Sequence, residues 1–169
     1  FQPARSGPMT VEGIDLATVP QGQRPFEYAY RTAVFARGEH PYILIIDDFK
    51  KDDQIREYIW NAALAKDLMT PESHQIEGSR ALLTDPGHDE RQLLVQMLSH
   101  EGDGAFSLKP VYSRHDEKNT EMVNLCFTSR CVAQRFRTLI YPRLKNDPQP
   151  QVEVSGNRYT ITVGDQVDE

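Results

Sequence analysis

The side chains here that most often carry acid–base or metal chemistry are the five histidines, His40, His74, His88, His100 and His115. No two of them stand four residues apart, the spacing that places two imidazoles on one helix face for a metal. Two histidines have carboxylate neighbours, in His88-Asp-Glu90 and His115-Asp-Glu117, which would suit acid–base work or metal ligation if the fold converged them. Consecutive residues point in different directions, so we expect two solvated loops and no catalytic or metal site.

Four aspartates in Asp47-Asp-Phe-Lys-Lys-Asp-Asp53 suggest a second metal hypothesis, because Ca²⁺ takes clustered carboxylates. The spacing matches no known calcium loop. Aspartate side chains in turns commonly accept hydrogen bonds from nearby backbone N–H groups. We therefore interpret the segment as a solvated polar turn and expect no cofactor, with a divalent metal left open as the alternative.

Other catalytic signatures are missing from the sequence. The serines lie in no Gly-x-Ser-x-Gly elbow, and the glycines form neither a dinucleotide fingerprint nor a phosphate loop. Paired carboxylates of the glycosidase type stay open, because such a pair is defined by its separation in space alone.

Two cysteines, Cys126 and Cys131, are too few for a disulfide scaffold or a zinc site. On one extended strand they would lie about 16 Å apart, too far for a bridge. A hairpin turn at Thr128-Ser-Arg130 would instead let them face each other. Two buried thiols are the expectation, and a bridge is the alternative.

The formal charge is −6, from 19 basic and 25 acidic residues, which opposes binding to nucleic acid. An acidic polysaccharide would meet the same repulsion unless arginines cluster locally, and the candidates are Arg31, Arg135, Arg137 and Arg143. Arginine stems that cover a sheet face with their heads in water are the simpler interpretation. The candidate substrate-binding residues are thus Arg31, Arg135 and Trp60, whose ring would anchor the core if buried and stack on a sugar if exposed.

Most of the chain is typical of β-strands. The runs Arg24–Phe35 and Tyr42–Phe49 are rich in β-branched and aromatic residues and predict two adjacent antiparallel strands. Tyr42–Ile46 is continuously apolar, which indicates a central strand buried on both faces. Further strands are predicted at Met9–Leu16, Ser79–Thr84, Gln92–Leu98, Glu121–Phe127, Val132–Tyr141, Gln151–Val154 and Arg158–Val163.

The segment Gln54–Met69 is ambiguous from its residues. Its apolar positions partly fit a helical face and favour a helix by a small margin, whereas Tyr58-Ile-Trp60 favours a strand.

A chain of 169 residues fits one domain, so residues 1–169 are expected to form a single sandwich with a partly irregular segment at 1–25. No apolar run approaches the roughly 20 residues that span a bilayer. Phe1 follows no signal-like segment, and we interpret the chain as excised from a larger protein.

The strands at Arg31-Thr-Ala-Val-Phe35, Tyr42-Ile-Leu-Ile-Ile-Asp-Asp48 and Arg135-Phe-Arg-Thr-Leu-Ile-Tyr-Pro142 resemble, in order and character, the β-sheet domain of heparinase II/III-like polysaccharide lyases. The resemblance runs from about Phe26 to Val163 and includes no catalytic motif. It implies an all-β fold, a two-layer antiparallel β-sandwich of the supersandwich kind. It also implies a strand after Asp48 that includes Tyr58, Ile59 and Trp60, and we adopt that strand over the helix.

Members of that family join an α/α-toroid to the β-sandwich and cleave uronate-containing glycans by β-elimination. Their catalytic Tyr and His come largely from the toroid, which has no counterpart here, so the resemblance implies an inactive piece that supports a substrate cleft. Relatives often carry a histidine close to the end of the strand after Asp48, where this sequence has Asn61-Ala-Ala63.

The expectation is therefore a domain of a secreted or periplasmic lyase acting on an acidic polysaccharide, with neither nucleic acid nor membrane as partner. A wide apolar patch on one sheet face would mark the contact with the missing toroid. The alternative is a free-standing carbohydrate-binding or adhesion sandwich, marked by an exposed row of Trp60, Tyr112 or Tyr141. An intact small enzyme would need a cleft where a histidine and carboxylates converge.

Overall fold

The structure, a computed structural model, describes residues 26–112, 120–156 and 158–169. Its centre is a six-stranded antiparallel sheet in the order β1-β2-β9-β6-β5-β4. These strands are β1 (Tyr28–Ala36), β2 (Tyr42–Lys50), β9 (Ala133–Leu144), β6 (His88–Ser99), β5 (Arg80–Asp85) and β4 (His74–Glu77).

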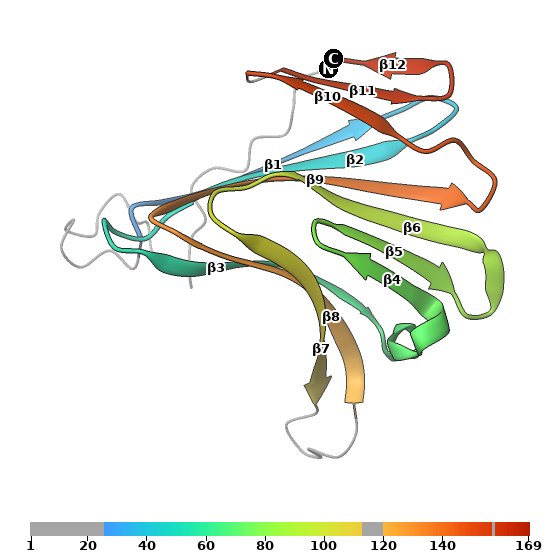
Figure 1. Cartoon of the computed structure of the whole chain (residues 1–169), viewed down its shortest axis with the longest axis horizontal. Helices are drawn as coiled ribbons and strands as arrows, with labels where there is room; N and C mark the ends of the chain where they lie inside the picture. Colours follow the sequence, from blue (N-terminus) through green and yellow to red (C-terminus); the bar gives the residue numbers. More distant parts are fainter. Residues whose placement is uncertain (1–25, 113–119, 157) are drawn as a thin grey trace, which may run out of the picture.

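Two smaller antiparallel sheets lie on either side of the central sheet (Figure 1). One has the order β3-β8-β7, with β3 at Arg56–Ala65, β8 at Thr120–Cys131 and β7 at Gly104–Tyr112. The other has the order β10-β11-β12, with β10 at Gln151–Ser155, β11 at Arg158–Val163 and β12 at Gln166–Asp168. Two short 3-10 helices, Lys66–Met69 and Pro71–Ser73, connect β3 to β4.

The main core fills the space between the central sheet and the β3-β8-β7 sheet. Period-two alternation sends Phe136, Val95 and Leu83 of the central sheet to one face, where they pack on Trp60, Phe106, Leu125 and Phe127 of the smaller sheet. The ring of Phe127 meets Phe106 at 5.0 Å and Phe136 at 6.0 Å between centroids, both edge to face. This arrangement suits the aromatic quadrupole and joins the two layers.

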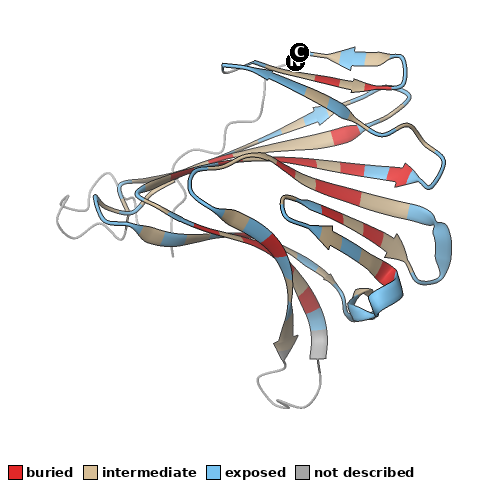
Figure 2. Ribbon diagram, viewed as in Figure 1, coloured by how far each residue is buried: buried red, intermediate tan, exposed pale blue. Residues whose placement is uncertain are grey.

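A second core covers part of the opposite face of the central sheet. Tyr42, Leu94, Leu139 and Tyr141 pack there against Ile161 and Val163 of β11. Figure 2 shows buried residues on the middle strands of the central sheet and on strands of both smaller sheets that pack against it. Because β10–β12 are short, they cover this face only around the C-terminal half of β9.

The central sheet and the β3-β8-β7 sheet meet at a corner. Three connections between them cross there, at residues 51–55, 100–103 and Val132. Gln134 lies there fully buried. Its amide accepts from the backbone N–H of Glu101 at 2.8 Å and donates to the Glu101 carbonyl at 3.1 Å and to Ser129 Oγ. Gly104 packs so closely on the Phe127 ring that a Cβ there would clash, and Gly102 has a φ of 75°, which glycine adopts readily.

The structure confirms the predicted antiparallel β-sandwich, to which β10–β12 add a third, partial layer. The hairpin of β1 and β2 is formed in full register from Tyr28↔Lys50 to Ala36↔Tyr42. β2 is an internal strand between β1 and β9. The strand adopted from the family resemblance is β3, and the helix favoured by its residues alone was wrong, because alternation buries Trp60 between the exposed Ile59 and Asn61.

Other details correct the sequence-based expectations. Asp47 and Asp48 belong to strand β2, so the polar turn begins only after Lys50. Thr128–Arg130 is not a hairpin turn: Cys126 and Cys131 both lie on β8 as free thiols, Cys126 buried and Cys131 half-buried. Strands β4, β7 and β12 were not predicted from the sequence. The predicted strand Met9–Leu16 and the irregular segment 1–25 lie outside the described residues.

Candidate functional site

The part of the central sheet that β10–β12 leave uncovered carries aromatic and cationic side chains side by side. In-register pairing sets Tyr30 opposite Asp48 and Asp48 opposite Arg135. Two residues farther along β9, toward the second core, Arg137 lies opposite Ile46 of β2 on one side and Ser99 of β6 on the other. Residues directly opposite each other project to the same face, so these side chains share one surface. We call this surface the open face.

Two adjoining hollows lie on the open face. The first has a volume of about 380 Å³ and is lined by Tyr28, Tyr30, Asp48, Arg135 and Arg137. The second has a volume of about 310 Å³ and is lined by Ile46, Ser99, His100, Glu101, Arg135, Arg137 and Tyr159. Arg135 and Arg137 line both hollows, so together they form one groove that runs from β1 toward β6 and β11.

At one end of the groove, Tyr28 and Tyr30 form a stacked pair. Their ring centroids are 6.0 Å apart and the planes are inclined by 19°. They are two residues apart on β1 and therefore project to the same face. Tyr30 is 48% exposed, so the pair offers an apolar ring surface with hydroxyl groups at its edge, the combination that suits a sugar.

The two arginines of the groove differ in how they are held. Arg137 donates to Asp48 Oδ1 at 3.1 Å and to the backbone carbonyls of Asp47 and Phe136, each at 3.1 Å. Its side chain is only 18% exposed. Arg135 is exposed, and its guanidinium has no hydrogen bond or ion pair with any of the described residues. Arg135 therefore provides the available positive charge, while Arg137 is fixed in the groove wall.

The other end of the groove is polar. Ser99 Oγ and the Tyr159 hydroxyl are hydrogen-bonded at 2.7 Å, which attaches β11 to the end of β6. His100 lies with its ring 4.8 Å from that of Phe127, and its Nδ1 is buried without a partner among the described residues. Glu101 places a carboxylate at this end, and its backbone is held by Gln134.

Only one of the three candidate residues named from sequence lies in the groove. Arg135 does. Arg31 lies on the opposite face of β1, where Nε and Nη2 donate to the two oxygens of the fully buried Asp47 at 2.6 and 2.9 Å, and this contact raises the pKa of Arg31. Trp60 is 4% exposed in the main core, so its ring is not available for stacking on a sugar.

The four arginines considered as a cluster are therefore divided. Arg143 lies eight residues beyond Arg135 on β9, is buried, and donates to the backbone carbonyls of Leu144, Lys145 and Asp147. It serves the turn after β9. Tyr141 is 1% exposed, and the side chain of Tyr112 lies outside the described part, so no exposed row of Trp60, Tyr112 and Tyr141 forms.

Each of the four aspartates between Asp47 and Asp53 forms an ion pair with a different basic side chain. Asp47 pairs with Arg31, Asp48 with Arg137, Asp52 with Arg56 at 2.6 Å and Asp53 with Lys50 at 2.6 Å. Arg56 lowers the pKa of Asp52. No group of three or more His, Cys, Asp or Glu suited to a metal occurs within residues 26–112, 120–156 and 158–169.

The histidine–carboxylate clusters do not form a site in the described structure. His88 Nδ1 lies 3.2 Å from Asp85 Oδ2 where β5 ends and β6 begins. The segment His88-Asp-Glu90 is exposed, but it is the start of strand β6 and not the predicted loop. His115-Asp-Glu117 lies outside the described residues. Within the described chain no helix is long and apolar enough to cross a bilayer.

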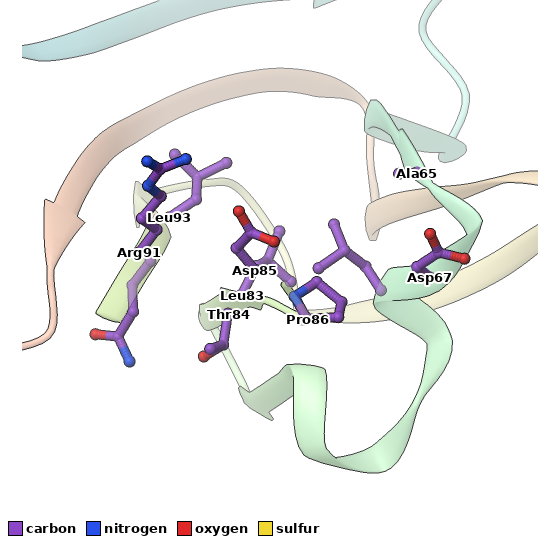
Figure 3. Close-up of a pocket in the computed structure, with 10 residues that line it drawn as sticks. Ala65, Asp67, Leu83, Thr84, Asp85, Pro86, Arg91 and Leu93 are labelled. Atoms are coloured by element: carbon purple, nitrogen blue, oxygen red, sulfur yellow. The ribbon is translucent and has the colours of Figure 1, made fainter. Parts of the chain in front are cut away.

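A third hollow, largely apolar and of about 380 Å³, lies at the end of the sandwich away from the corner (Figure 3). Leu68, Leu83 and Leu93 line its interior, and Asp67, Asp85 and Arg91 stand around it. It continues the main core where the two sheets separate, and we interpret it as a gap in the packing of the sandwich.

The outer face of the β3-β8-β7 sheet is the nearest match to the expected apolar patch. Ile59 is 43% and Met122 is 40% exposed. The exposed Ala63, Ala65 and Ala105 share the face with them.

Sequence reasoning missed Tyr28 and Tyr30. Their period-two spacing was visible, as was that of Arg135 and Arg137. The sequence does not reveal the strand register, which places Tyr28 and Tyr30 of β1 on the same face as Arg135 and Arg137 of β9, across β2.

No protein-family model matches this chain, and no curated protein matches it.

Proposed function

We propose that this chain is the β-sheet domain of a heparinase II/III-like polysaccharide lyase and that it binds an acidic glycan along the open face without catalysing its cleavage. The observation that carries this proposal is the groove with the Tyr28–Tyr30 pair at one end and the free guanidinium of Arg135 in the middle. Aromatic rings stack on the apolar faces of sugars. A guanidinium binds a carboxylate with two parallel hydrogen bonds.

The net charge of the chain restricts where such a glycan binds. With a formal charge of −6, most of the surface repels a polyanion. Arg135 is a local exception, because no described carboxylate neutralises it. We therefore expect binding to depend on one small region.

The proposed lack of catalysis follows from the chemistry of β-elimination and from the family resemblance. The reaction needs a base for the proton beside the carboxylate and an acid for the departing oxygen. Of the groove residues, Tyr159 has its hydroxyl bonded to Ser99, and His100 packs its ring on Phe127. We assign the proton transfers to the toroid of the parent protein, and the face with Ile59 and Met122 to the contact with it.

A free-standing glycan-binding module is the second candidate. The stacked tyrosines favour it, because they form a binding surface that is complete without a partner domain. The parent architecture distinguishes the two candidates: a helical-repeat region upstream of Phe1 is expected for the lyase and not for the module.

The test combines binding and turnover. The purified chain is titrated with oligosaccharides of alginate, heparan sulfate and a neutral glucan at low ionic strength, and unsaturated uronate is followed by its absorbance. We expect binding to acidic oligosaccharides, weakening with salt, and no unsaturated product. The matched control for Arg135→Gln is Arg130→Gln, which removes the same charge from an exposed position on β8.

Two results would contradict the proposal. If no acidic oligosaccharide binds, or if Arg130→Gln weakens binding as much as Arg135→Gln does, the open face is not the binding site. Release of unsaturated product by the chain alone would show that it is catalytic.

A further inference from the structure

The charges of the groove point to one kind of acidic glycan. Four described side chains with formal charge line the two hollows, namely Asp48, Glu101, Arg135 and Arg137. They sum to zero. Asp48 and Arg137 form an ion pair and neutralise each other. Glu101 and Arg135 remain as a single carboxylate and a single guanidinium.

From this arrangement, and resting on the proposed function, we infer that the open face selects uronate glycans without sulfate over highly sulfated ones. The groove has one free guanidinium and therefore one place for one carboxylate per bound segment. An unsulfated uronate residue presents one such group. A heavily sulfated disaccharide presents several, and the further anionic groups would meet the unpaired Glu101 and an Arg137 whose charge Asp48 already neutralises.

The positions of the side chains explain how one uronate residue would be held. Tyr30 and Arg135 lie in the same row with Asp48 between them. Adjacent strands are about 4.8 Å apart, so the backbones beneath Tyr30 and Arg135 are separated by roughly 10 Å. One sugar ring above this row contacts the tyrosine pair with its face and directs its carboxylate to Arg135.

The polar end of the groove would hold the next sugar through its hydroxyl groups. Ser99 and Tyr159 already share a hydrogen bond, and a hydroxyl oxygen keeps acceptor capacity when it donates. Glu101 accepts hydrogen bonds from sugar hydroxyls and repels a sulfate at the same place. The groove thus alternates a carboxylate position with a hydroxyl position.

The test compares oligosaccharides of equal length that differ in sulfation. The intact chain is titrated calorimetrically with an alginate hexasaccharide, a heparin hexasaccharide and a neutral glucan hexasaccharide. The alginate oligomer is expected to bind at least tenfold more tightly than the heparin oligomer. Arg135→Gln should lower alginate affinity by about tenfold or more, the effect of losing a charged hydrogen bond, with Arg130→Gln as the control.

A second pair of variants tests the selectivity. Asp48→Asn releases the Arg137 guanidinium from its ion pair, and Glu101→Gln removes the unpaired carboxylate. Each should raise the ratio of heparin affinity to alginate affinity severalfold, whatever the change in alginate affinity itself. Both substituted side chains lie on the surface of the groove, and thermal melting checks that the variants are folded.

The outcomes separate this inference from the proposal on which it rests. Equal or tighter binding of heparin overturns the inference and leaves glycan binding intact. Failure of Asp48→Asn and Glu101→Gln to raise the ratio of heparin affinity to alginate affinity also overturns it. If no acidic hexasaccharide binds, the proposed function itself fails.

Discussion

The two faces of the central sheet use neighbouring aspartates in opposite ways. Asp47 lies on the face of the main core, fully buried, and Arg31 covers it with two hydrogen bonds. Asp48, the next residue, lies on the open face and pairs with Arg137 in the wall of a groove. One step along a strand thus separates a structural ion pair from one beside the candidate binding site, because alternate side chains project to opposite faces.

The covered half of the outer face extends this comparison. Leu139 and Tyr141 continue the same side of β9 as Arg135 and Arg137, and β11 buries them. The change from arginine to apolar residues therefore occurs where the third sheet begins. Among the described residues, the side chains at this end of β9 are therefore less closely packed than those beneath β11.

The largest difference is expected from deletion of one aromatic ring in the main core, Phe127 of β8, and of one on the open face, Tyr30 of β1. Phe127→Ala should lower the free energy of unfolding by about 3–5 kcal/mol, because Phe127 is fully buried between Phe106 and Phe136. Tyr30→Ala should change it by less than about 1 kcal/mol, since the ring is half exposed. Urea unfolding of both variants measures this, and equal losses would mean that the open face is part of the core.

Loss of an arginine from each face should have a smaller effect. Arg31→Gln leaves the Asp47 carboxylate buried without its bidentate partner, which costs about 1–3 kcal/mol. Arg135→Gln should stay within about 0.5 kcal/mol of the parent, as is usual for exposed positions. The urea midpoints of unfolding of the two variants measure this difference. If Arg135→Gln is the more destabilised variant, the two arginines do not differ in the way proposed.

The smallest effect is expected at the turn between β5 and β6, where an exposed carboxylate serves as the reference. The backbone N–H of Gly87, and next His88, lower the pKa of Asp85 below its ordinary value. A lowered folded-state pKa stabilises the protein above the unfolded-state pKa, and this contribution is lost as pH falls through the folded-state pKa. Asp85→Asn should therefore melt slightly lower at neutral pH and match the parent in strong acid.

Thermal melts across an acid series test this expectation, with Asp89→Asn, at the exposed start of β6, as the control. A deficit for Asp85→Asn that stays constant with pH would assign its effect to something other than the ionised carboxylate.

Local pattern was enough for most of the fold. Alternating apolar residues and the turn residues between them predict the β1–β2, β5–β6 and β10–β11 hairpins, because each is closed by neighbours in sequence. β7 was missed because Pro110 lies within it, and proline argues against a strand except at a sheet edge, which is where β7 lies. The Gln54–Met69 segment shows the same limit, since only packing against Phe106 fixes Trp60 in a strand.

The groove was less accessible to prediction than the fold. Its residues come from β1, β2, β6, β9 and β11 and from the connection after β6. The pairing of Asp48 with Arg135 joins positions 87 residues apart in the chain. Arg135 was named from its charge alone. Arg31 had equal standing in the sequence, and only the register reveals that it projects to the opposite face, toward Asp47.

The buried side-chain amide of Gln134 affects how rigidly the two sheets are joined at the corner of the sandwich. It ties the Glu101 backbone to Ser129, close to where three of the four connections between the central sheet and the β3-β8-β7 sheet cross; the fourth, from β3 to β4, lies at the opposite end. β8 extends from that corner over 12 residues, or roughly 40 Å. A hinge rotation of about 5° at one end of such a lever displaces the other by about 3 Å, so the amide at the corner and the β3–β4 connection at the opposite end together limit how far the two sheets separate.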